Sequence, residues 1–502
     1  METSFSILLV AGVSAPFLCA ALIALFWPCI GEKSARALSA AFSGISLAAA
    51  LVLWGVYMAN YGLNIGFAFV TPSFMSWAGI PSMGLNGVSM PIFAMAAIVG
   101  FAAVLWAAKT DIRNPRLYFL LLMVMQGGLM GAFASTNLLW MYMFHEFALV
   151  PTFIAMSVWG GAGKRMAAMQ MAVYLTLGAL ISLIGIIAIY VQTNAASFGL
   201  QDIVLALAAL PMSDSWQSCV FALLLFGLGT LVSLFPFYTW APRTYSAAPT
   251  SFAMLHAGVL KKFGLYVLIQ AAVPLLPAGC ANWAYALAVL ALFNVVYIGL
   301  VTMAQRDLKM MVSYSSVAHM GLCFLGIASM SVLGVGGAVL LMFGHGLSVA
   351  LLFMLSNAVV NRTGEWNMLT MGGLYRQTPV LAGFFIAATL ASLELPGFAN
   401  FWGELSILMS LWSFNPAICA VAATGIIISA IYGLRAVANI FMGEPTKELE
   451  PKFSGIKDMT VSEKIPAVIL LAALLFVGFY PKSITQPLDS DLSVVPAYNQ
   501  SK

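Results

Sequence analysis

The strongest constraint on this sequence is its series of long apolar runs. Their predicted bounds are 4–27, 35–58, 86–108, 117–135, 137–158, 167–192, 216–238, 248–273, 283–303, 311–330, 333–360, 379–412, 415–442 and 464–481. Most are about 20 residues or longer, which lets an α-helix cross the ~30 Å of hydrocarbon in a bilayer. Since 62% of the residues are hydrophobic and 8% are charged, no soluble enzyme domain is left over. We therefore expect an all-α polytopic membrane protein with about 14 transmembrane helices.

Lys and Arg residues support this count, because they alternate between the two ends of successive helices. Lys261 and Lys262 lie inside a helix, and only Lys482 and Lys502 fall on one side. The other side holds Lys33, Arg36, Lys109, Arg113, Arg116, Lys164, Arg165, Arg243, Arg306, Lys309, Arg362, Arg376, Arg435, Lys447, Lys452, Lys457 and Lys464. Basic loops remain in the cytoplasm. We therefore expect both termini on the external side of a bacterial inner (cytoplasmic) membrane.

Two of the helices carry proline-rich interruptions. The eighth is entered through a proline-rich break, with Pro236 and Pro242 followed by Pro249, and the twelfth, too long for one regular span, contains Pro396 and Gly397. Proline removes a helix hydrogen bond and kinks or breaks a helix. We therefore predict broken helices at these two places.

The predicted helices also group into two runs of five. Residues 1–115 hold helices one to three, 116–273 a first five-helix repeat, 274–445 a second, and 446–502 a cytoplasmic loop, the last helix and an external C-terminal tail. An odd number of crossings inverts the second repeat relative to the first, as in many transporters. We expect two inverted five-helix repeats.

Motifs for common enzyme and binding sites are missing. The six cysteines stand far apart with no CxxC pair, so iron–sulfur, zinc and thiol-redox sites lack ligands. The sequence has no GxSxG, no Walker loop and no GxGxxG after a strand. We expect this chain to bind no metal and no cofactor, and to contact the lipid bilayer and no nucleic acid.

Ionisable residues inside the predicted helices are the candidate functional groups. A charge at the bilayer centre costs ~2.5–3.5 kcal/mol, so it normally faces a wet cavity or a polar partner. Glu146, Glu404 and one of the adjacent Lys261 and Lys262 are such charges, of both signs and on separate helices. Because carboxylates and amines can bind and release protons once burial has shifted their affinities, these groups indicate a proton path.

Other ionisable residues have plainer explanations. Asp307 and Lys309 suit the interfacial cap of a helix. A neutral His145 or His256 can form hydrogen bonds inside a helix bundle without any transport role.

Several motifs together resemble a known family. They are HEFALVPTF, FPFYTWAPRTYSAAPT, HAGVLKKFGLY, AQRDLKMMVSYSSVAHMG, GHGLSVALLF and LPGFANFWGE. In order and spacing, across roughly residues 85–445, they resemble the antiporter-like membrane subunits of respiratory complex I, and the length resembles chain M, or subunit 4. The resemblance implies a fourteen-helix fold and a proton path along the membrane midplane.

The resemblance also implies roles for individual residues. Glu146 matches the fifth-helix glutamate of the family, and Lys262 matches the eighth-helix lysine that connects the two half-channels. His319 and His345 match the histidines of the tenth and eleventh helices. Glu404 matches the acidic exit residue of the twelfth helix, which implies proton exchange with the external side.

Departures from the family pattern concern both halves but are more serious in the first. The seventh-helix lysine of the family is replaced by Leu231, and Arg243 stands where the family has an aspartate. Lys261 and Glu394 are extra charges. Together with His256 and Arg243, they are the additional candidate site residues.

Helix geometry sharpens the expectation for the two lysines. Adjacent helix positions diverge by about 100°, so Lys261 and Lys262 cannot both face one cavity. We expect Lys262 to be the relay and to lie closer than Lys261 to His319 or His345.

Without a lysine at position 231, Glu146 should be a buried and protonated acid, because desolvation disfavours an unpaired carboxylate. Three arrangements remain open. A lysine of a neighbouring subunit reaches Glu146, Arg243 folds toward it, or it forms a hydrogen bond to His145 or Tyr238.

The leading interpretation is a proton-translocating subunit of an NADH:quinone oxidoreductase. NADH, flavin, iron–sulfur clusters and quinone would then be bound by partner subunits, and other membrane subunits would be the neighbours. The alternatives are a subunit of a multi-subunit Na⁺ or K⁺/H⁺ antiporter, a subunit of a membrane-bound hydrogenase-type complex, and a largely structural subunit with an impaired first half-channel.

Overall fold

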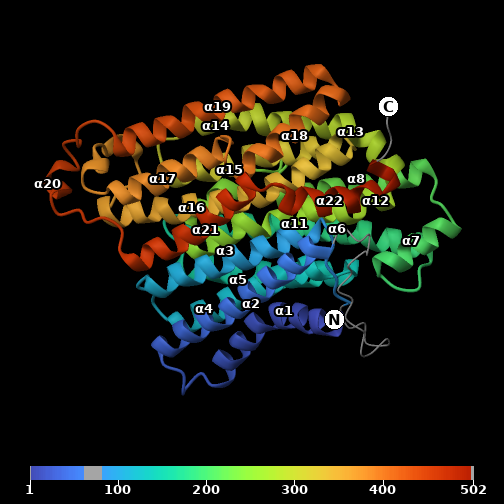
Figure 1. Ribbon diagram of the computed structural model, residues 1–502, viewed down its shortest axis with the longest axis horizontal. Helices are drawn as coiled ribbons and strands as arrows, with labels where there is room; N and C mark the ends of the chain where they lie inside the picture. The colour runs from blue at the N-terminus through green and yellow to red at the C-terminus, as the bar shows by residue number, and fades with distance from the viewer. Residues whose placement is uncertain (1, 61–81, 499–502) are drawn as a thin grey trace.

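The computed structural model describes residues 2–60 and 82–498. Within these ranges every regular element is a helix, and three isolated β-bridges are the only extended pairings. Most helices run along the long dimension of the molecule (Figure 1). Thirteen helical segments of the described residues are long and apolar enough to cross a membrane. The expected all-α polytopic fold is confirmed.

The first half of the chain contains α1 (Glu2–Leu25), α2 (Glu32–Asn60), α3 (Ser89–Lys109), α4 (Pro115–Ala134), α5 (Leu138–Trp159), α6 (Lys164–Thr193), α7 (Leu200–Ala209), α8 (Asp214–Val232), α9 (Trp240–Ala247), α10 (Thr250–Leu255), η2 (His256–Leu260), α11 (Lys262–Val267), η3 (Leu268–Ala272) and α12 (Val273–Leu275). The second half contains α13 (Pro277–Leu292), η4 (Phe293–Ile298), α14 (Gly299–Met303), α15 (Leu308–Ala328), α16 (Val332–Thr363), η5 (Met368–Thr370), η6 (Leu374–Arg376), α17 (Pro379–Ser392), α18 (Ala399–Phe414), α19 (Pro416–Phe441), α20 (Glu450–Phe453), α21 (Val461–Phe479), α22 (Lys482–Ser493) and η7 (Pro496–Tyr498).

The broken helix α17–α18 supplies the fourteenth expected crossing. α17 ends at Ser392 and α18 begins at Ala399, so residues 393–398 leave the helix. The break contains Pro396, and Gly397 has a φ of 102°, a left-handed conformation that favours glycine. The predicted interruption at Pro396 and Gly397 is confirmed.

The first proline-rich interruption has two parts in the structure. The predicted helix over 216–238 is too long, because α8 ends at Val232 and α9 begins only at Trp240. The predicted break before the eighth helix is confirmed at residues 248–249, between Ala247 at the end of α9 and Thr250 at the start of α10. Pro242 lies in the first turn of α9, where the missing N–H group costs no intrahelical hydrogen bond. Pro236, which lies within 233–239, marks the break between α8 and α9. The seventh helix is therefore the broken one, and the eighth begins after a short turn at 248–249.

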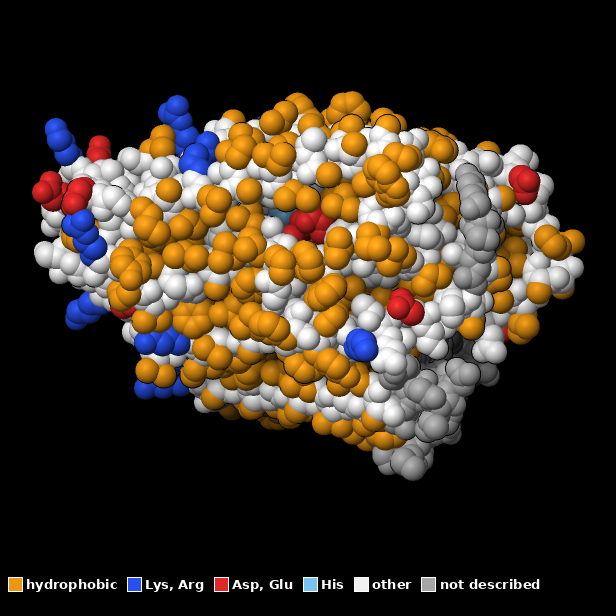
Figure 2. All heavy atoms as spheres, turned by 45° about the horizontal axis from the view of Figure 1, so that its top comes forward, with side chains coloured by type: hydrophobic (Ala, Val, Ile, Leu, Met, Phe, Trp, Pro, Cys, Tyr) orange, Lys and Arg blue, Asp and Glu red, His pale blue; other side chains and the backbone are white. Residues whose placement is uncertain are grey.

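Basic side chains and chain ends mark opposite ends of the molecule. Lys and Arg gather at the end that holds α20, whereas both termini lie toward the other end, and the face between them is largely hydrophobic (Figure 1 and Figure 2). This polarity is that of an integral multi-pass membrane protein. The C-terminal segment folds back along the bundle, since α22 packs against α2 and α16 and Tyr57 donates a hydrogen bond of 2.7 Å to Asp491. Residues 499–502 of the predicted external tail lie outside the described residues.

The connections that precede α5 and α15 share one form. Asn137 accepts the backbone N–H groups of the first turn of α5, and Asp307 does the same for α15. Each of these caps also forms an isolated antiparallel bridge, Asn137 with Gly199 and Asp307 with Asn367. The inverted repeats 116–273 and 274–445 stay a prediction, and related repeats would produce such matching connections.

Candidate functional site

The eighth crossing contains a wide turn at the position of the two lysines. Residues His256–Leu260 form a π-helical turn, closed by the hydrogen bond of 3.0 Å from the Lys261 N–H to the His256 carbonyl. Lys261 and Lys262 follow at once and are only 1% and 0% exposed. Single π-helical turns are frequent at functional sites. Two amines at such depth need polar partners, because burial without them is costly.

Lys262 has close polar partners. Its Nζ donates to the Ala257 carbonyl at 2.6 Å and lies 2.8 Å from Nδ1 of His345 on α16. An ammonium group only donates, so a protonated Lys262 requires Nδ1 of His345 to be the acceptor. The structure therefore places Lys262 beside His345, as the sequence predicted.

Lys261 faces different helices. Its Nζ makes one longer hydrogen bond, 3.3 Å, to the Ser316 carbonyl of α15, and lies 5.5 Å from the centre of the Tyr245 ring. The expected divergence of the two lysines is confirmed, although neither reaches lipid. Lys261 has fewer hydrogen bonds than its three N–H groups can form.

His319 of α15 continues the series from His345. The two imidazole rings have centroids 5.5 Å apart. Nδ1 of His319 lies 2.7 Å from the Ser315 carbonyl, and Nε2 lies 2.9 Å from the Ser392 carbonyl. Because carbonyl oxygens only accept, both contacts are hydrogen bonds only when both ring nitrogens carry a proton. The site therefore suits an imidazolium, and Oε1 of Glu394 lies 4.0 Å from Nε2.

Glu394 and Glu404 lie at the far end of this series. Both are 5% exposed, and both line a cleft of about 20 Å³ together with His319 and residues of α14, α15 and α19. The structure thus brings together five predicted site residues, namely Lys262, His319, His345, Glu394 and Glu404.

Glu146 on α5 lies apart from this series. Its side chain is 30% exposed, and its neighbours Met143, Phe147 and Val150 on the same helix are exposed by 40%, 43% and 53%. The expectation of a fully buried Glu146 is wrong, because this side of α5 faces out of the bundle. Its nearest ionisable partner is Nδ1 of His145 at 3.4 Å. Among the described residues, no Lys or Arg lies within 4.0 Å of it.

Other first-half candidates do not complete a path. Arg243 is exposed and donates a hydrogen bond of 3.2 Å to Gln170, so it does not fold toward Glu146. His256 is buried between the rings of Trp240 and Tyr245, with centroids 5.6 and 5.2 Å away, and its Nδ1 has no hydrogen-bond partner. His256 therefore shares the neighbouring Tyr245 ring with Lys261, whereas Lys262 contacts His345.

Two polar groups near the site, Tyr432 and Ser315, were not among the predicted site residues. The Tyr432 hydroxyl of α19 lies 2.9 Å from the Ser315 hydroxyl, which lies 3.4 Å from Nδ1 of His319. Ser315 precedes His319 by four residues, so the i, i+4 spacing could have identified it. Tyr432 belongs to a distant segment, and no local pattern connects it to His319.

The two charged residues of the QRDLK segment that were predicted to cap the helix, Asp307 and Lys309, have different roles. Asp307 accepts the Met310 N–H at 2.8 Å, which confirms the predicted helix cap. Lys309 does not reach the surface as predicted, because it is 7% exposed and donates at 2.7 Å to the Ala248 carbonyl in the turn before α10.

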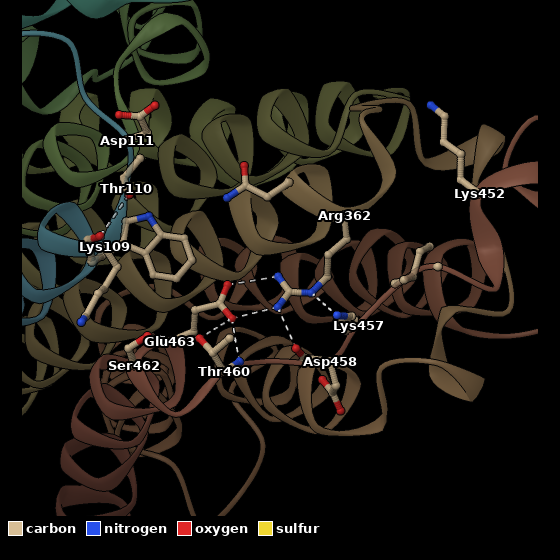
Figure 3. Close-up of a pocket in the computed structure, with 14 residues that line it drawn as sticks. Lys109, Thr110, Asp111, Arg362, Lys452, Lys457, Asp458, Thr460, Ser462 and Glu463 are labelled. Carbon is tan, nitrogen blue, oxygen red and sulfur yellow. Dashed lines mark hydrogen bonds and ion pairs between the residues drawn. The ribbon is translucent and has the colours of Figure 1, made fainter.

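A cavity of about 930 Å³ opens at the basic end of the molecule. Arg362 donates two hydrogen bonds, 2.8 and 3.2 Å, to the carboxylate of Glu463 and others to the Lys457 and Asp458 carbonyls (Figure 3). This network joins the end of α16 to the start of α21. The cavity gives water access to the protein at that end. No group of three His, Cys, Asp or Glu in the described part of the chain could hold a metal ion.

Comparisons with known proteins agree with the fold and the motifs. A family model described as "NADH:quinone oxidoreductase/Mrp antiporter, TM" matches residues 135–429. NAD(P)H-quinone oxidoreductase chain 4 2 of Synechococcus sp. (strain JA-3-3Ab) is 33% identical over 430 residues, which cover 84% of this chain and 78% of the relative.

Solved structures share the architecture over nearly the whole length. A chain of respiratory complex I from Thermus thermophilus is 26% identical with a TM-score of 0.83, covering 97% of this chain and 99% of that one. A chain of the Mrp complex from Dietzia sp. DQ12-45-1b has a TM-score of 0.85 at 18% identity, covering 99% and 98%, and shows the fold alone. The chain therefore belongs to the family of transmembrane NADH:quinone oxidoreductase and Mrp antiporter subunits.

Proposed function

We propose that this chain is a proton-translocating membrane subunit of a respiratory NADH:quinone oxidoreductase. The chain 4 relatives, at about a third identity over most of the chain, favour this assembly over other members of the family. The observation that carries the proposal is the contact of 2.8 Å between Lys262 Nζ and His345 Nδ1, with His319 and two carboxyl groups beyond it.

The proposed transfer begins at Lys262. Its ammonium group gives a proton across 2.8 Å to Nδ1 of His345, and His345 releases the proton from Nε2 toward His319. The ring centroids are 5.5 Å apart, so a water molecule or a ring rotation bridges this step. His319 first gives a ring proton to Glu394 and Glu404, and the ring nitrogen that this frees takes up the proton from His345. The two carboxyl groups exchange their proton outside the bundle. All of these groups lie in membrane-spanning segments, where unpaired charges are rare without a function.

The remaining assignments belong to the same proposal. NADH, flavin, iron–sulfur clusters and quinone are bound by partner subunits, and this chain takes part in the translocase without redox chemistry of its own. Its partners are the other membrane subunits, and it resides in a bacterial inner membrane with both termini external. The placement of the basic loops at one end of the molecule supports this orientation (Figure 2).

Purification of the native assembly tests the function directly. We expect flavin- and iron–sulfur-containing subunits to co-purify, and the assembly in proteoliposomes to acidify the lumen when NADH is oxidised by a quinone. Assembly with small antiporter subunits, together with Na⁺- or K⁺-dependent proton exchange that needs no NADH, would replace this proposal with the antiporter alternative, which the Mrp fold leaves available.

A further inference from the structure

The break between α17 and α18 places an additional carboxyl group beside Glu404. Glu394 has a φ of 57°, a left-handed conformation that is uncommon for residues other than glycine, asparagine and aspartate. Its side chain is nevertheless 2% exposed. A non-glycine residue keeps this conformation only where the surrounding structure holds it. The break therefore holds the Glu394 carboxyl group inside the protein.

The two carboxyl groups form a pair. Glu394 and Glu404 line the same cleft, and Oε1 of each has no hydrogen-bond partner. Two carboxyl groups in one cleft can form a hydrogen bond to each other only when one of them holds a proton. Two ionised carboxylates in contact inside a membrane protein repel each other and lose their hydration. The pair therefore holds at least one proton.

The surroundings balance a single negative charge. Nε2 of His319 lies 4.0 Å from Oε1 of Glu394, and among the described residues no Lys or Arg lies within 4.0 Å of either carboxylate. The other ionisable groups that face the pair are Cys323 and Tyr432. An imidazolium at His319 and one shared proton on the pair give a neutral cluster.

A cleft connects the pair with the outside of the bundle. Its volume of about 20 Å³ suffices for one water molecule, and Ser429 and Tyr432 of α19 supply polar groups in its lining. In the space-filling view, acidic and histidine side chains are visible in an opening in the middle of the hydrophobic face (Figure 2). The cleft thus leads from the pair to the surface that lipid or a neighbouring subunit covers.

We propose that Glu394 and Glu404 act as one proton-sharing acid pair, which exchanges its proton through the cleft between α15 and α19. The shared proton then belongs to both carboxyl groups, so Glu394 takes part in the exchange together with Glu404. This inference rests on the proposed function for its role in transport, but the shared proton can be measured in an assembly that does not pump.

A hydrophobic carbodiimide, dicyclohexylcarbodiimide, detects such a pair in the intact assembly. The O–H of a protonated carboxyl group adds across a C=N bond of the reagent, and the acyl group then moves from oxygen to nitrogen, which leaves a stable N-acylurea. We expect mass spectrometry to find one label per chain, on Glu394 or Glu404. In Glu394→Gln, the amide can donate to an ionised Glu404, so labelling of Glu404 should fall. No label on either residue of the parent, or undiminished labelling of Glu404 in Glu394→Gln, would overturn the pair.

Proton translocation supplies the second measurement. We expect Glu394→Gln and Glu404→Gln each to lower the rate by about tenfold or more, and the double variant to lose no more than either single one. Losses that multiply, or a Glu394→Gln assembly that pumps like the parent, would contradict the proposal. If a variant fails to assemble, labelling of the parent still decides.

Glu444 provides the matched control for both measurements. Arg376 donates hydrogen bonds of 2.7 and 2.8 Å to this exposed carboxylate, and these bonds lower the pKa of the Glu444 carboxyl group. Glu444 therefore stays ionised and should take no label, and Glu444→Gln should leave labelling of the pair unchanged.

Discussion

The two halves of the molecule contain the same kind of broken helix but differ in what lies at the break. Asn294 satisfies the interrupted backbone of 233–239, since it donates to the Ser233 carbonyl at 2.9 Å and accepts the Phe235 N–H at 2.7 Å. The Phe235 ring stacks on Phe293 with centroids 4.8 Å apart. The first break is therefore closed by an amide and aromatic rings, and residues 233–239 contain no carboxyl, amine or imidazole group.

The second break is lined by ionisable groups instead. Residues 393–398 bring Glu394 next to Glu404 and His319. Irregular backbone at membrane depth survives where it is buried in protein or lines a cavity, and both breaks meet this condition in different ways. The two halves therefore share a broken helix and differ in the side chains at the break, and we infer that these side chains decide whether protons can use it.

The largest effect should follow from replacing Lys262, the first group in the proposed proton path of the second half. We expect Lys262→Met to lower proton translocation by about tenfold or more, because His345 loses its proton donor. Methionine has a similar length and buries no charge, so the subunit should assemble. The exposed Lys482→Met is the control, and the measurement is lumen acidification per NADH oxidised. If the Lys262→Met assembly acidifies the lumen per NADH oxidised as much as the parent does, the second half is not the proton path.

The sequence predicts the second half better than the first for physical reasons. Pro396 and Gly397 interrupt one long apolar run, so the helix break can be predicted from the neighbouring residues alone. In the first half, the end of the seventh helix was misplaced, because the apolar run over 216–238 continues beyond Val232, where α8 ends. Pro242 falls in the first turn of α9, where proline is tolerated.

The orientation of individual side chains was harder to predict. Lys262 could be placed beside His345 from the motif, but the exposure of Glu146 depends on which side of α5 the other helices leave uncovered. The pairing of Glu394 with Glu404 depends on the left-handed φ of one residue, and no pattern in the sequence reveals it.

A smaller effect should follow from Glu146→Gln in the first half. The carboxyl group is half-buried and has no Lys or Arg partner among the described residues, so the free energy of unfolding should change by no more than about 0.5 kcal/mol. We expect translocation, measured as lumen acidification per NADH oxidised, to fall by less than in Lys262→Met.

A loss of translocation as large as that of Lys262→Met would change the comparison. The first half would then take part in the path, completed by a neighbouring subunit at the exposed side of α5.

The smallest effect on transport should come from Lys261→Leu, which separates the two adjacent lysines. Lys261 makes one hydrogen bond of 3.3 Å although it is almost fully buried, so its ammonium group is poorly compensated. Burying an ammonium group without a charged partner costs several kcal/mol of desolvation, which an apolar side chain of similar size avoids. We therefore expect a melting temperature equal to or above that of the parent, with translocation unchanged. If Lys261→Leu instead abolishes translocation as Lys262→Met does, then Lys261, Tyr245 and His256 form part of the path, and the first half is connected through the eighth helix despite Leu231.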